Sequence, residues 1–464
     1  MVLRQYYLGC LAQASYLVAD ERSGRAVVVD PRRDVEDYLA DAERMGLRIE
    51  EVILTHIHAD FVSGHLELRD RNGCRIRLGA RAKVDYPYTA LREGDTVELG
   101  TVRLGILETP GHTPEAISIT VFDLAKDPAR PQAVLTGDAL FVGDVGRPDL
   151  LASLGATAEE MARELYRSLR RKLLALPDET LVYPGHGAGS MCGRSLGPEN
   201  VSTIGRQRRD NYALQPMSED EFVALVTVDQ PEAPAYFAHD SAFNRAERPT
   251  LAEVMERERR PLSVDEVVGL REAGAQVLDS REPPVFAAAH LSRSVNIGLS
   301  GKFATWAGTL LERDRAIVVV ADPGREAETA LRLGRIGFDQ VVGHLDGGAI
   351  ALRGRPELIA STIRLSADEL AERLDSARPP AVVDVRTPAE RMGAAIAGSA
   401  HVPLQQLKRR TGELPPGADL VMVCASGFRS CIAASLLECE GFGAVADLAG
   451  GMAAWVARQT ASRA

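Results

Sequence analysis

The stretch Thr55-His56-Ile57-His58-Ala59-Asp60-Phe61 is the most informative segment of the chain. It follows the apolar run Val52–Leu54, which predicts a short buried strand that ends in a loop. Because alternate residues on extended backbone point the same way, His56 and His58 could converge on one ion while Asp60 reaches its edge. The stretch therefore predicts a metal site. A polar loop whose histidines only form hydrogen bonds is the alternative.

Three further candidate ligands each follow a predicted strand: His112, Asp138 and His186. Each comes directly after a glycine, which lets two backbones approach closely, and a rigid sheet can hold each side chain in place. Together with His56 they form a set that indicates a metal site much more specifically than any single residue does. His65, in Ser63-Gly64-His65, is a weaker candidate, because an ordinary surface or core histidine is an equal alternative.

This set of residues resembles the metallo-β-lactamase superfamily over the N-terminal half of the chain. In that family a His-x-His-x-Asp-His loop, a later His, a bridging Asp and a last His build a two-metal site on an αββα sandwich. Here Phe61 stands at the sixth position of the loop, where the family has histidine. The loss of this imidazole disfavours a paired-zinc hydrolase of the glyoxalase II kind.

The remaining ligands suit one metal with open coordination positions, the pattern of non-haem iron oxygenases. The persulfide dioxygenase branch of the superfamily is similar. That resemblance implies one Fe(II) per chain, with zinc as the alternative, held by His56, His112 and Asp138. The three other polar side chains of the set are expected to orient the ligands and waters: His58, Asp60 and His186.

Two nearby residues are candidates for contact with the substrate. Arg147, in Gly146–Asp149, resembles the dioxygenase segment near the thiol carrier, where a fixed cation could meet a carboxylate. A structural ion pair is the equal alternative for Arg147. Cys192, six residues after His186, could approach the metal and relay sulfur, although a small buried thiol is the favoured interpretation.

Beyond Pro261 the chain repeats itself. The stretch 277–283 (VLDSREP) matches 382–388 (VVDVRTP) at an offset of 105 residues, and the glycine pair 347–348 matches 450–451. Each copy has the order strand, Pro turn, strand, glycine-bearing loop and helix. This order predicts two small parallel α/β sheets, each with its site at the C-terminal end of a strand.

In the second copy, the predicted strand Leu420–Val423 leads Cys424 into a glycine-bearing loop, and a helix follows through Leu437. Such a loop can turn backbone N–H groups inward and set the thiol at a helix N-terminus, which favours thiolate and binds anions. The motif resembles the rhodanese sulfurtransferases, in which the matching cysteine carries a persulfide. The resemblance implies that Cys424 is the nucleophile. The residues expected to hold sulfite or thiosulfate are Arg429, Ser426 and Gly427.

The first copy departs from this pattern at the corresponding loop, 321–326 (ADPGRE). Asp322 is predicted to replace the nucleophile, in a loop that is two residues shorter. An aspartate there would repel an anion and cannot form a persulfide. We therefore expect an inactive rhodanese that serves as a spacer, docking surface or oligomer contact.

Composition limits the partners and the compartment. A length of 464 residues suggests roughly three domains, and an apolar content of 45% is ample for packed cores. The formal net charge of −11 argues against nucleic acid or anionic lipid as a partner. The N-terminus lacks the apolar core of a signal peptide, and six cysteines in so long a chain do not resemble a disulfide framework. A reducing cytoplasm is the expected location, without a membrane span.

The sequence thus predicts an α/β multi-domain chain. An αββα metallo-β-lactamase sandwich with closing helices and a connector is expected over residues 1–260, an inactive rhodanese domain over 261–358 and an active one over 359–464. The two rhodanese domains are expected to be small parallel-sheet α/β folds.

The resemblance also implies an activity. A thiol persulfide of the glutathione or coenzyme A type would react with dioxygen to give sulfite and free thiol, and Cys424 would transfer sulfane sulfur with thiosulfate as product or donor. A zinc-dependent thioester hydrolase with appended sulfurtransferase modules is one alternative, and a non-catalytic sulfur carrier is another. Assembly as a homo-oligomer stays open.

Overall fold

A computed structural model describes residues 1–150, 157–194, 196–228, 230, 233–258, 260–443 and 445–461. They form two units, which we describe separately. The first comprises Met1–Glu253 with Gly334–Gly337, and the second comprises Val254–Leu333 with Phe338–Ala464. Among the residues in these ranges, no helix is long and apolar enough to cross a membrane.

The first unit contains two six-stranded sheets. In sheet order, the first is β1 (Val2–Leu8), β2 (Gln13–Asp20), β3 (Arg25–Val29), β4 (Arg48–Ile53), β5 (Arg75–Gly79) and β6 (Thr89–Leu91). The second is β12 (Ser202–Thr203), β11 (Leu181–Pro184), β10 (Ala133–Gly137), β9 (Ile117–Asp123), β8 (Val102–Glu108) and β7 (Thr96–Glu98).

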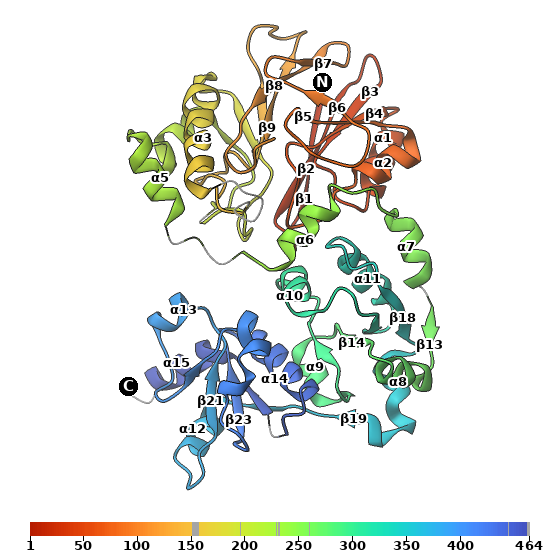
Figure 1. The fold of residues 1–464 in the computed structure, drawn as a ribbon, viewed down its shortest axis with the longest axis vertical. Helices are drawn as coiled ribbons and strands as arrows, with labels where there is room; N and C mark the ends of the chain where they lie inside the picture. The colour runs from red at the N-terminus through yellow and green to blue at the C-terminus, as the bar shows by residue number, and fades with distance from the viewer. Residues whose placement is uncertain are drawn as a thin grey trace. The chain divides into compact units, whose positions relative to one another are not determined.

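Helices cover the outer faces of both sheets. Figure 1 shows α1 (Glu36–Arg44) and α2 (His65–Asn72) on one flank, and α3 (Ala158–Arg171) and α5 (Glu219–Thr227) on the other. Between the sheets, β-branched side chains such as Val27, Val29 and Ile119 are fully buried in one core cluster. Each such side chain contributes roughly 1.5–3 kcal/mol by its burial. This αββα arrangement confirms the predicted fold.

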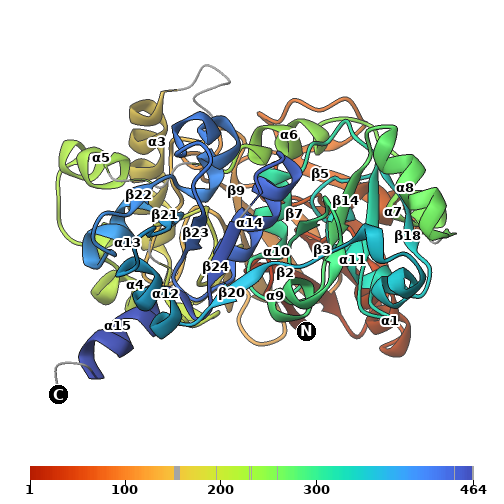
Figure 2. The same cartoon turned by 90° about the horizontal axis from the view of Figure 1, so that it is seen from below.

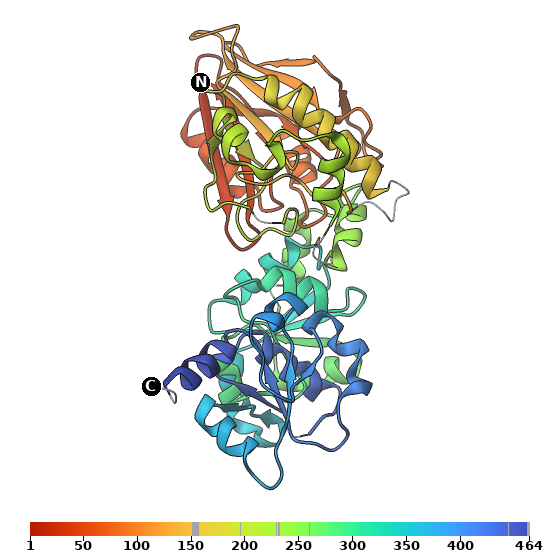
Figure 3. The same ribbon diagram turned by 90° about the vertical axis from the view of Figure 1, so that its left-hand side faces the viewer.

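Helix α3 shows how local sequence sets an outer layer. A capping box between Thr157 and Glu160 starts the helix, and Met161, Leu165 and Leu169 then recur every four residues and are buried. In Figure 3 this yellow helix lies across the orange strands of the second sheet. Helix α3 ends at Arg171, and a short 3-10 turn, Leu173–Ala175, follows.

The sheet topology brings the candidate ligand loops to one edge. Strands β10 and β11 are parallel, and β8 runs in the same direction because β9 is antiparallel to both of its neighbours. The loops that carry Asp138, His186 and His112 therefore leave the same edge of the second sheet. The Ile117 N–H donates to the Thr55 carbonyl at 2.8 Å, which ties the loop after β4 to that edge.

The second unit holds two five-stranded parallel sheets with the same strand order, which agrees with the predicted repeat. The first is β13 (Pro261–Leu262), β18 (Val341–Leu345), β17 (Ile317–Val320), β14 (Gln276–Asp279) and β16 (Val295–Asn296). The second is β20 (Ile363–Leu365), β24 (Val445–Leu448), β23 (Leu420–Val423), β21 (Ala381–Asp384) and β22 (Ala400–His401).

Eight helices surround the two parallel sheets in the part of the unit that the structure describes. In chain order they are α8 (Val264–Glu272), α9 (Pro283–Ala288), α10 (Phe303–Leu310), α11 (Glu326–Gly334), α12 (Ala367–Leu374), α13 (Pro388–Gly393), α14 (Arg429–Cys439) and α15 (Gly451–Ala461).

Helix α14 connects the two copies. It packs against β23 and β24 of its own sheet and against β16 of the first copy (Figure 2). The Asn296 N–H donates to Ser435 Oγ at 2.9 Å, and Cys431 Sγ donates to Asn296 Oδ1 at 3.4 Å. Its residues from Ser430 to Leu437 are all buried. Each copy keeps its own hydrophobic core, and α14 forms the packed contact between them.

Candidate functional site

His56, His112 and Asp138 converge although they come from three different loops. One ligand atom from each lies within 4.8 Å of the other two. Asp138 Oδ2 is 3.8 Å from His56 Nε2 and 3.5 Å from His112 Nε2. These distances are longer than ordinary hydrogen bonds, and all three side chains are buried. Three donor atoms thus face one point, as they do in a metal site.

Hydrogen bonds on the far side of each imidazole set its orientation. His112 Nδ1 donates to the Arg147 carbonyl at 3.0 Å. His56 Nδ1 lies 3.0 Å from Thr55 Oγ1, whose own proton is donated to Asp30 Oδ2 at 2.7 Å, so the ring nitrogen must be the donor. Both rings therefore turn an Nε2 lone pair toward the centre of the cluster.

The protonation states also suit a cation. Burial lowers the pKa of His112, and burial together with His58 lowers the pKa of His56 well below 6.5, so both rings are neutral. Burial acts in the opposite sense on Asp138, but the charge and the hydrogen bond of His186 outweigh it and hold the Asp138 pKa far below its usual range. Two neutral imidazoles and one carboxylate fit a divalent metal with open positions.

His186 connects two carboxylates. Its Nδ1 donates to Asp138 Oδ1 at 2.8 Å, and its Nε2 lies 2.9 Å from Asp60 Oδ2. Burial lowers the His186 pKa, but the two carboxylates outweigh burial and raise this pKa well above 6.5. His58 faces elsewhere, since its Nε2 lies 3.0 Å from Asp30 Oδ1. His186 is therefore placed to hold Asp138 in position.

Cys192 lies beside this network. Ligand atoms of Asp60, His186 and Cys192 are within 4.8 Å of one another, and all three residues are buried. Burial, together with Asp60 and Asp138, raises the pKa of the Cys192 thiol well above 9.0. A carboxylate, an imidazole and a thiol at this spacing also form a ligand set that suits zinc.

The second candidate site lies at the C-terminal end of β23. The Cys424 thiol is buried, and the Gly427 N–H donates to Cys424 Sγ at 3.1 Å. Gly427 has a φ of +89°, a conformation that favours glycine and turns this N–H toward the sulfur. Ser430 Oγ lies 3.5 Å from the same sulfur and donates to Asp447 Oδ2 at 3.2 Å. Ser430 Oγ therefore accepts from the thiol, and the Gly427 N–H is the donor that favours a thiolate or persulfide anion.

Known protein families match both halves of the chain. The model of the metallo-beta-lactamase superfamily matches residues 8–186, and the model of the rhodanese-like domain matches residues 263–352 and 366–458. The human mitochondrial persulfide dioxygenase ETHE1 is 30% identical over 234 residues, which cover 49% of this chain and 80% of that protein. The chain belongs to the metallo-β-lactamase superfamily. Two rhodanese-like domains follow its metallo-β-lactamase domain.

Two further relatives support this assignment. An uncharacterised protein of Mycobacterium leprae is 31% identical over 241 residues, which cover 46% of this chain and 99% of that protein. A crystal structure of a metallo-beta-lactamase from Staphylococcus aureus matches with a TM-score of 0.66 and 30% identity, and it covers 74% of this chain and 98% of that chain. The resemblance drawn from the sequence is thereby confirmed.

Phe61 closes one side of the metal cluster in the metallo-β-lactamase domain. Its ring is fully buried, with its centroid 4.4 Å from that of His58 and 6.5 Å from that of His186. An apolar ring thus stands where the superfamily loop has an imidazole. A phenyl group cannot ligate a metal, so the cluster contains fewer ligands for a second ion.

Asn244, which the sequence did not reveal as a site residue, holds the loop that carries the candidate ligand His56. Its side-chain NH₂ donates to the carbonyls of His58 at 2.9 Å and Phe61 at 2.7 Å, and its Oδ1 accepts the Ser63 N–H at 2.9 Å. Asn244 is fully buried and follows helix α6 (Tyr236–Phe243). No local motif marks it, because its partners lie more than 180 residues earlier in the chain.

We expect Asn244→Ala to weaken metal binding about 10–100-fold and to lower Tm, because it removes three hydrogen bonds that fix the loop. Chelator competition measures the affinity, and calorimetry measures Tm. Asn72→Ala, at an exposed position of α2, is the matched control and should change neither quantity. Unchanged affinity and Tm in Asn244→Ala would show that the loop holds its shape without this residue.

Arg147 is a buried structural residue in this domain. Its guanidinium forms a bidentate ion pair with Asp149 at 2.6 and 2.7 Å and donates to the Met191 carbonyl at 3.2 Å. Its own carbonyl accepts the His112 hydrogen bond. These contacts favour the ion-pair alternative over substrate binding. His65 is a core histidine, fully buried with its ring centroid 4.7 Å from that of Tyr86.

Arg429 of the second rhodanese-like domain is engaged by a carboxylate. Its guanidinium donates to Glu390 at 2.6 and 2.8 Å, and this contact lowers the Glu390 pKa to about 2. Ser426 is exposed at the mouth of the loop. If Arg429 binds an anion as predicted, its guanidinium must contact both Glu390 and the incoming anion.

The loop of the first rhodanese-like domain is not shortened, so that prediction is wrong. Its strand ends at Val320 and helix α11 begins at Glu326, while in the second domain the strand ends at Val423 and helix α14 begins at Arg429. Both loops thus contain the same number of residues. The shorter element is helix α11, which follows the loop.

Ala321, rather than Asp322, occupies the nucleophile's position. The Ala321 carbonyl packs against Gly348 in the way that the Cys424 carbonyl packs against Gly451, where an added Cβ would lie 2.8 Å and 2.4 Å away, respectively. The assignment of Asp322 came from counting back from the end of a helix that is shorter than its counterpart. Because an alanine methyl group cannot carry sulfur, this loop has no nucleophile at that position.

Proposed function

We propose that this chain oxidises a low-molecular-weight thiol persulfide with dioxygen at one Fe(II), and that Cys424 transfers sulfane sulfur. The observation that carries the proposal is the convergence of His56, His112 and Asp138 beside the non-ligating ring of Phe61. The match to a human persulfide dioxygenase over the same half of the chain supports it. Two rhodanese-like domains in the other half support a sulfur substrate.

The proposed oxidation is R–S–SH + O₂ + H₂O → R–SH + SO₃²⁻ + 2 H⁺. A bound ferrous ion would supply the electron transfer that lets triplet dioxygen react with the persulfide. The chain's own residues would hold that ion, because the neutral rings of His56 and His112 and the carboxylate of Asp138 face one point. Their burial excludes bulk water from the reacting groups.

His186 and Asp60 form a charged network beside the candidate metal ligands. The His186 ring lies between the carboxylates of Asp138 and Asp60, with its Nε2 2.9 Å from Asp60 Oδ2. His186 is thus held as a cation by two carboxylates. Its hydrogen bond to Asp138 keeps the ligand carboxylate in one orientation.

The proposed sulfur transfer is Cys424–S⁻ + S₂O₃²⁻ → Cys424–S–S⁻ + SO₃²⁻, and a thiol persulfide can replace thiosulfate as the donor. The Cys424 thiolate attacks the sulfane sulfur, the S–S bond of the donor breaks, and sulfite leaves with the bonding electrons. The Gly427 N–H, 3.1 Å from the sulfur, stabilises the anionic product. In the reverse direction, sulfite made by the first site takes the sulfane sulfur from the Cys424 persulfide and becomes thiosulfate. Linking both sites in one chain raises the effective concentration of sulfite.

A zinc-dependent thioester hydrolase is the second candidate function. The cluster of Asp60, His186 and Cys192 favours it, because this cluster could hold a second metal near the first. This alternative requires two metals per chain and cleavage of an S-acyl thiol without dioxygen. Anaerobic purification followed by elemental analysis decides between them. We expect one iron per chain and no hydrolysis of S-acyl glutathione, whereas two zinc ions with hydrolysis would overturn the proposal.

We expect Phe61→His to raise the number of zinc ions bound per chain from one to two. The new imidazole would stand beside His186 and complete a second ligand set with Asp60. Elemental analysis after zinc loading and gel filtration measures the ratio. Phe61→Leu keeps an apolar side chain of similar size, so this variant should still bind one zinc ion per chain. A ratio of two in the unmodified chain would show that Phe61 does not exclude the second metal.

A further inference from the structure

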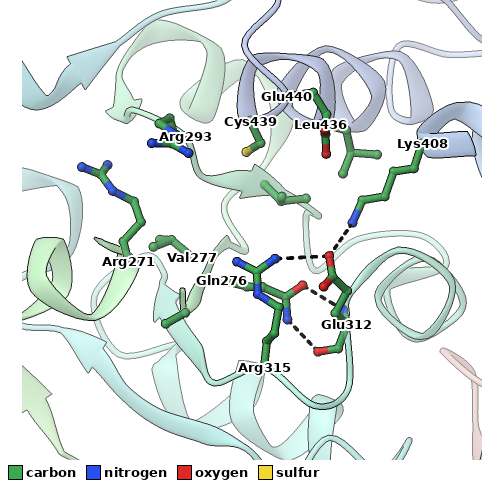
Figure 4. Close-up of a pocket in the computed structure, with 12 residues that line it drawn as sticks. Arg271, Gln276, Val277, Arg293, Glu312, Arg315, Lys408, Leu436, Cys439 and Glu440 are labelled. Atoms are coloured by element: carbon green, nitrogen blue, oxygen red, sulfur yellow. Dashed lines mark hydrogen bonds and ion pairs between the residues drawn. The ribbon is translucent and has the colours of Figure 1, made fainter. Parts of the chain in front are cut away.

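A cavity of about 160 Å³ lies between the two rhodanese-like domains, and both domains contribute to its wall. Figure 4 shows that cationic groups dominate its polar lining. They come from α8, from the turn before β16, from the loop before β17 and from the second domain: Arg271, Arg293, Arg315 and Lys408. Two carboxylates, Glu312 and Glu440, line the same cavity, so cations outnumber anions by four to two among the described residues of its wall.

Two of these cations are neutralised within the protein. Glu312 accepts ion pairs from Arg315 at 3.2 Å and from Lys408 at 3.4 Å. Arg315 Nε also donates to the Gly274 carbonyl at 2.7 Å, and Lys408 Nζ donates to the Leu310 carbonyl at 3.0 Å. This side of the cavity is therefore a satisfied ion-pair network that joins the two domains.

The other two cations have no carboxylate partner. Within the described parts of the chain, neither Arg271 nor Arg293 forms an ion pair, and the buried Arg271 Nε has no hydrogen-bond partner. Arg271 Nη1 donates only to Ser292, at 2.5 Å to its carbonyl. Burial lowers the pKa of Arg271, and the charge of Arg293 lowers it further. Arg271 and the exposed Arg293 thus line the cavity without an ion pair to any described residue, and the carboxylate of Glu440 lies in the same wall.

The protein holds Arg293 in place at an energetic cost. Its backbone φ is +60°, in the left-handed region that non-glycine residues rarely adopt. Glu438 of α14 accepts the Arg293 N–H at 2.9 Å and lies 3.0 Å from His290 Nε2, which fixes this turn. The second domain therefore positions a cation of the first domain at the cavity.

We propose that this cavity binds a small oxyanion of the sulfite, thiosulfate, sulfate or phosphate class between Arg271 and Arg293. Planar guanidinium groups match the oxygen pairs of such anions. The size agrees, because the cavity is several times the roughly 30 Å³ share of one water but below the roughly 300 Å³ of sites for larger ligands. The apolar side chains of Val277, Val295 and Leu436 line the remainder and strengthen the attraction by excluding water.

The site is separate from the proposed sulfur-transfer loop. Cys439 of the cavity is the last residue of α14, whereas Cys424 lies before its first turn. The eleven residues of this helix span about 16 Å. An anion bound here would bridge cations of both domains and stabilise their packing. Only the inclusion of sulfite and thiosulfate among the candidate anions rests on the proposed function.

Binding is tested on the full chain carrying Cys424→Ser, without turnover, by calorimetric titration with thiosulfate, sulfite, sulfate and phosphate at constant ionic strength. We expect at least one of these anions to bind and to raise Tm relative to chloride. The tightest of the four identifies the physiological class. Because no catalysis is measured, a failed dioxygenase assay would leave this result unaffected.

Arg271→Gln and Arg293→Gln are each expected to weaken that binding at least tenfold, and Arg293→Lys should retain part of it because the charge remains. Arg353→Gln, at an exposed arginine of the same domain, is the matched control and should bind as the parent does. The proposal is overturned if none of the four anions binds, or if Arg271→Gln and Arg293→Gln both bind as tightly as the parent.

Discussion

Asp138→Ala is expected to abolish tight metal binding and to lower dioxygen uptake at least a thousandfold. Asp138 is the carboxylate that faces His56 and His112 at 3.8 and 3.5 Å, and it also accepts the His186 hydrogen bond at 2.8 Å. Its removal deletes a charged ligand and leaves the His186 cation with one buried partner fewer. Elemental analysis and an oxygen electrode measure the two effects.

Sulfur transfer serves as the internal control for this variant. Cys424 lies in the other unit, so its activity should stay within about twofold when Asp138 is replaced. Asp138→Ala protein that kept its metal and its uptake would show that another ligand set binds the iron. Loss of both activities together would show a general folding defect, which calorimetry would detect as a lower Tm.

Cys424→Ser is expected to lower sulfur transfer from thiosulfate to cyanide on the order of a thousandfold or more, while dioxygen uptake stays within about twofold. A serine hydroxyl is a poor nucleophile at neutral pH and cannot carry a persulfide. The Gly427 N–H that stabilises the sulfur anion would remain but would have no anion to stabilise. Thiocyanate formation measures the transfer.

Cys431→Ser is the matched control for this substitution. Cys431 is buried in helix α14, which follows the loop, and its Sγ donates to Asn296 Oδ1. A serine there can keep the hydrogen bond, so transfer should remain within a few fold. If Cys424→Ser also abolished dioxygen uptake, the two sites would not be independent and the two-site account would be wrong.

The repeat made the second unit predictable from sequence. The motif at 277–283 recurs at 382–388, and the structure gives both copies the same strand order. In the first unit, the apolar run Val52–Leu54 identified the buried end of strand β4. The edge strand β1 escaped prediction because its polar and half-exposed residues, among them Arg4 and Gln5, lack an apolar run.

The local geometry of the loop that carries His56 and His58 predicted only part of the candidate metal cluster. Alternation on an extended loop suggested that His56 and His58 share one ion, but only His56 turns to Asp138. Asp30 lies 3.0 Å from His58 Nε2 and holds that ring elsewhere. Asp30 directly follows β3 and is distant in sequence from the loop. The pattern of the loop therefore could not reveal that His58 faces Asp30 instead of Asp138. The family resemblance supplied the set that the structure brings together.

The remaining site residues depend on contacts between distant segments. Asn244 reaches back to the loop that carries His56, and Glu390 occupies the guanidinium of Arg429. The misplacement of Asp322 had a similar cause, since the count relied on a helix of the wrong length, whereas strand ends and glycine packing identify Ala321. Motifs therefore located the reactive groups, and tertiary contacts determine how those groups are held.

Dioxygen uptake by the iron-loaded chain tests the central claim most directly. The protein is purified anaerobically, loaded with one Fe(II), and mixed with glutathione persulfide or coenzyme A persulfide in an oxygen electrode. We predict that one dioxygen is consumed for each persulfide, with sulfite and free thiol formed in equal amounts. Absence of uptake with either persulfide, in protein shown to contain iron, would contradict the account.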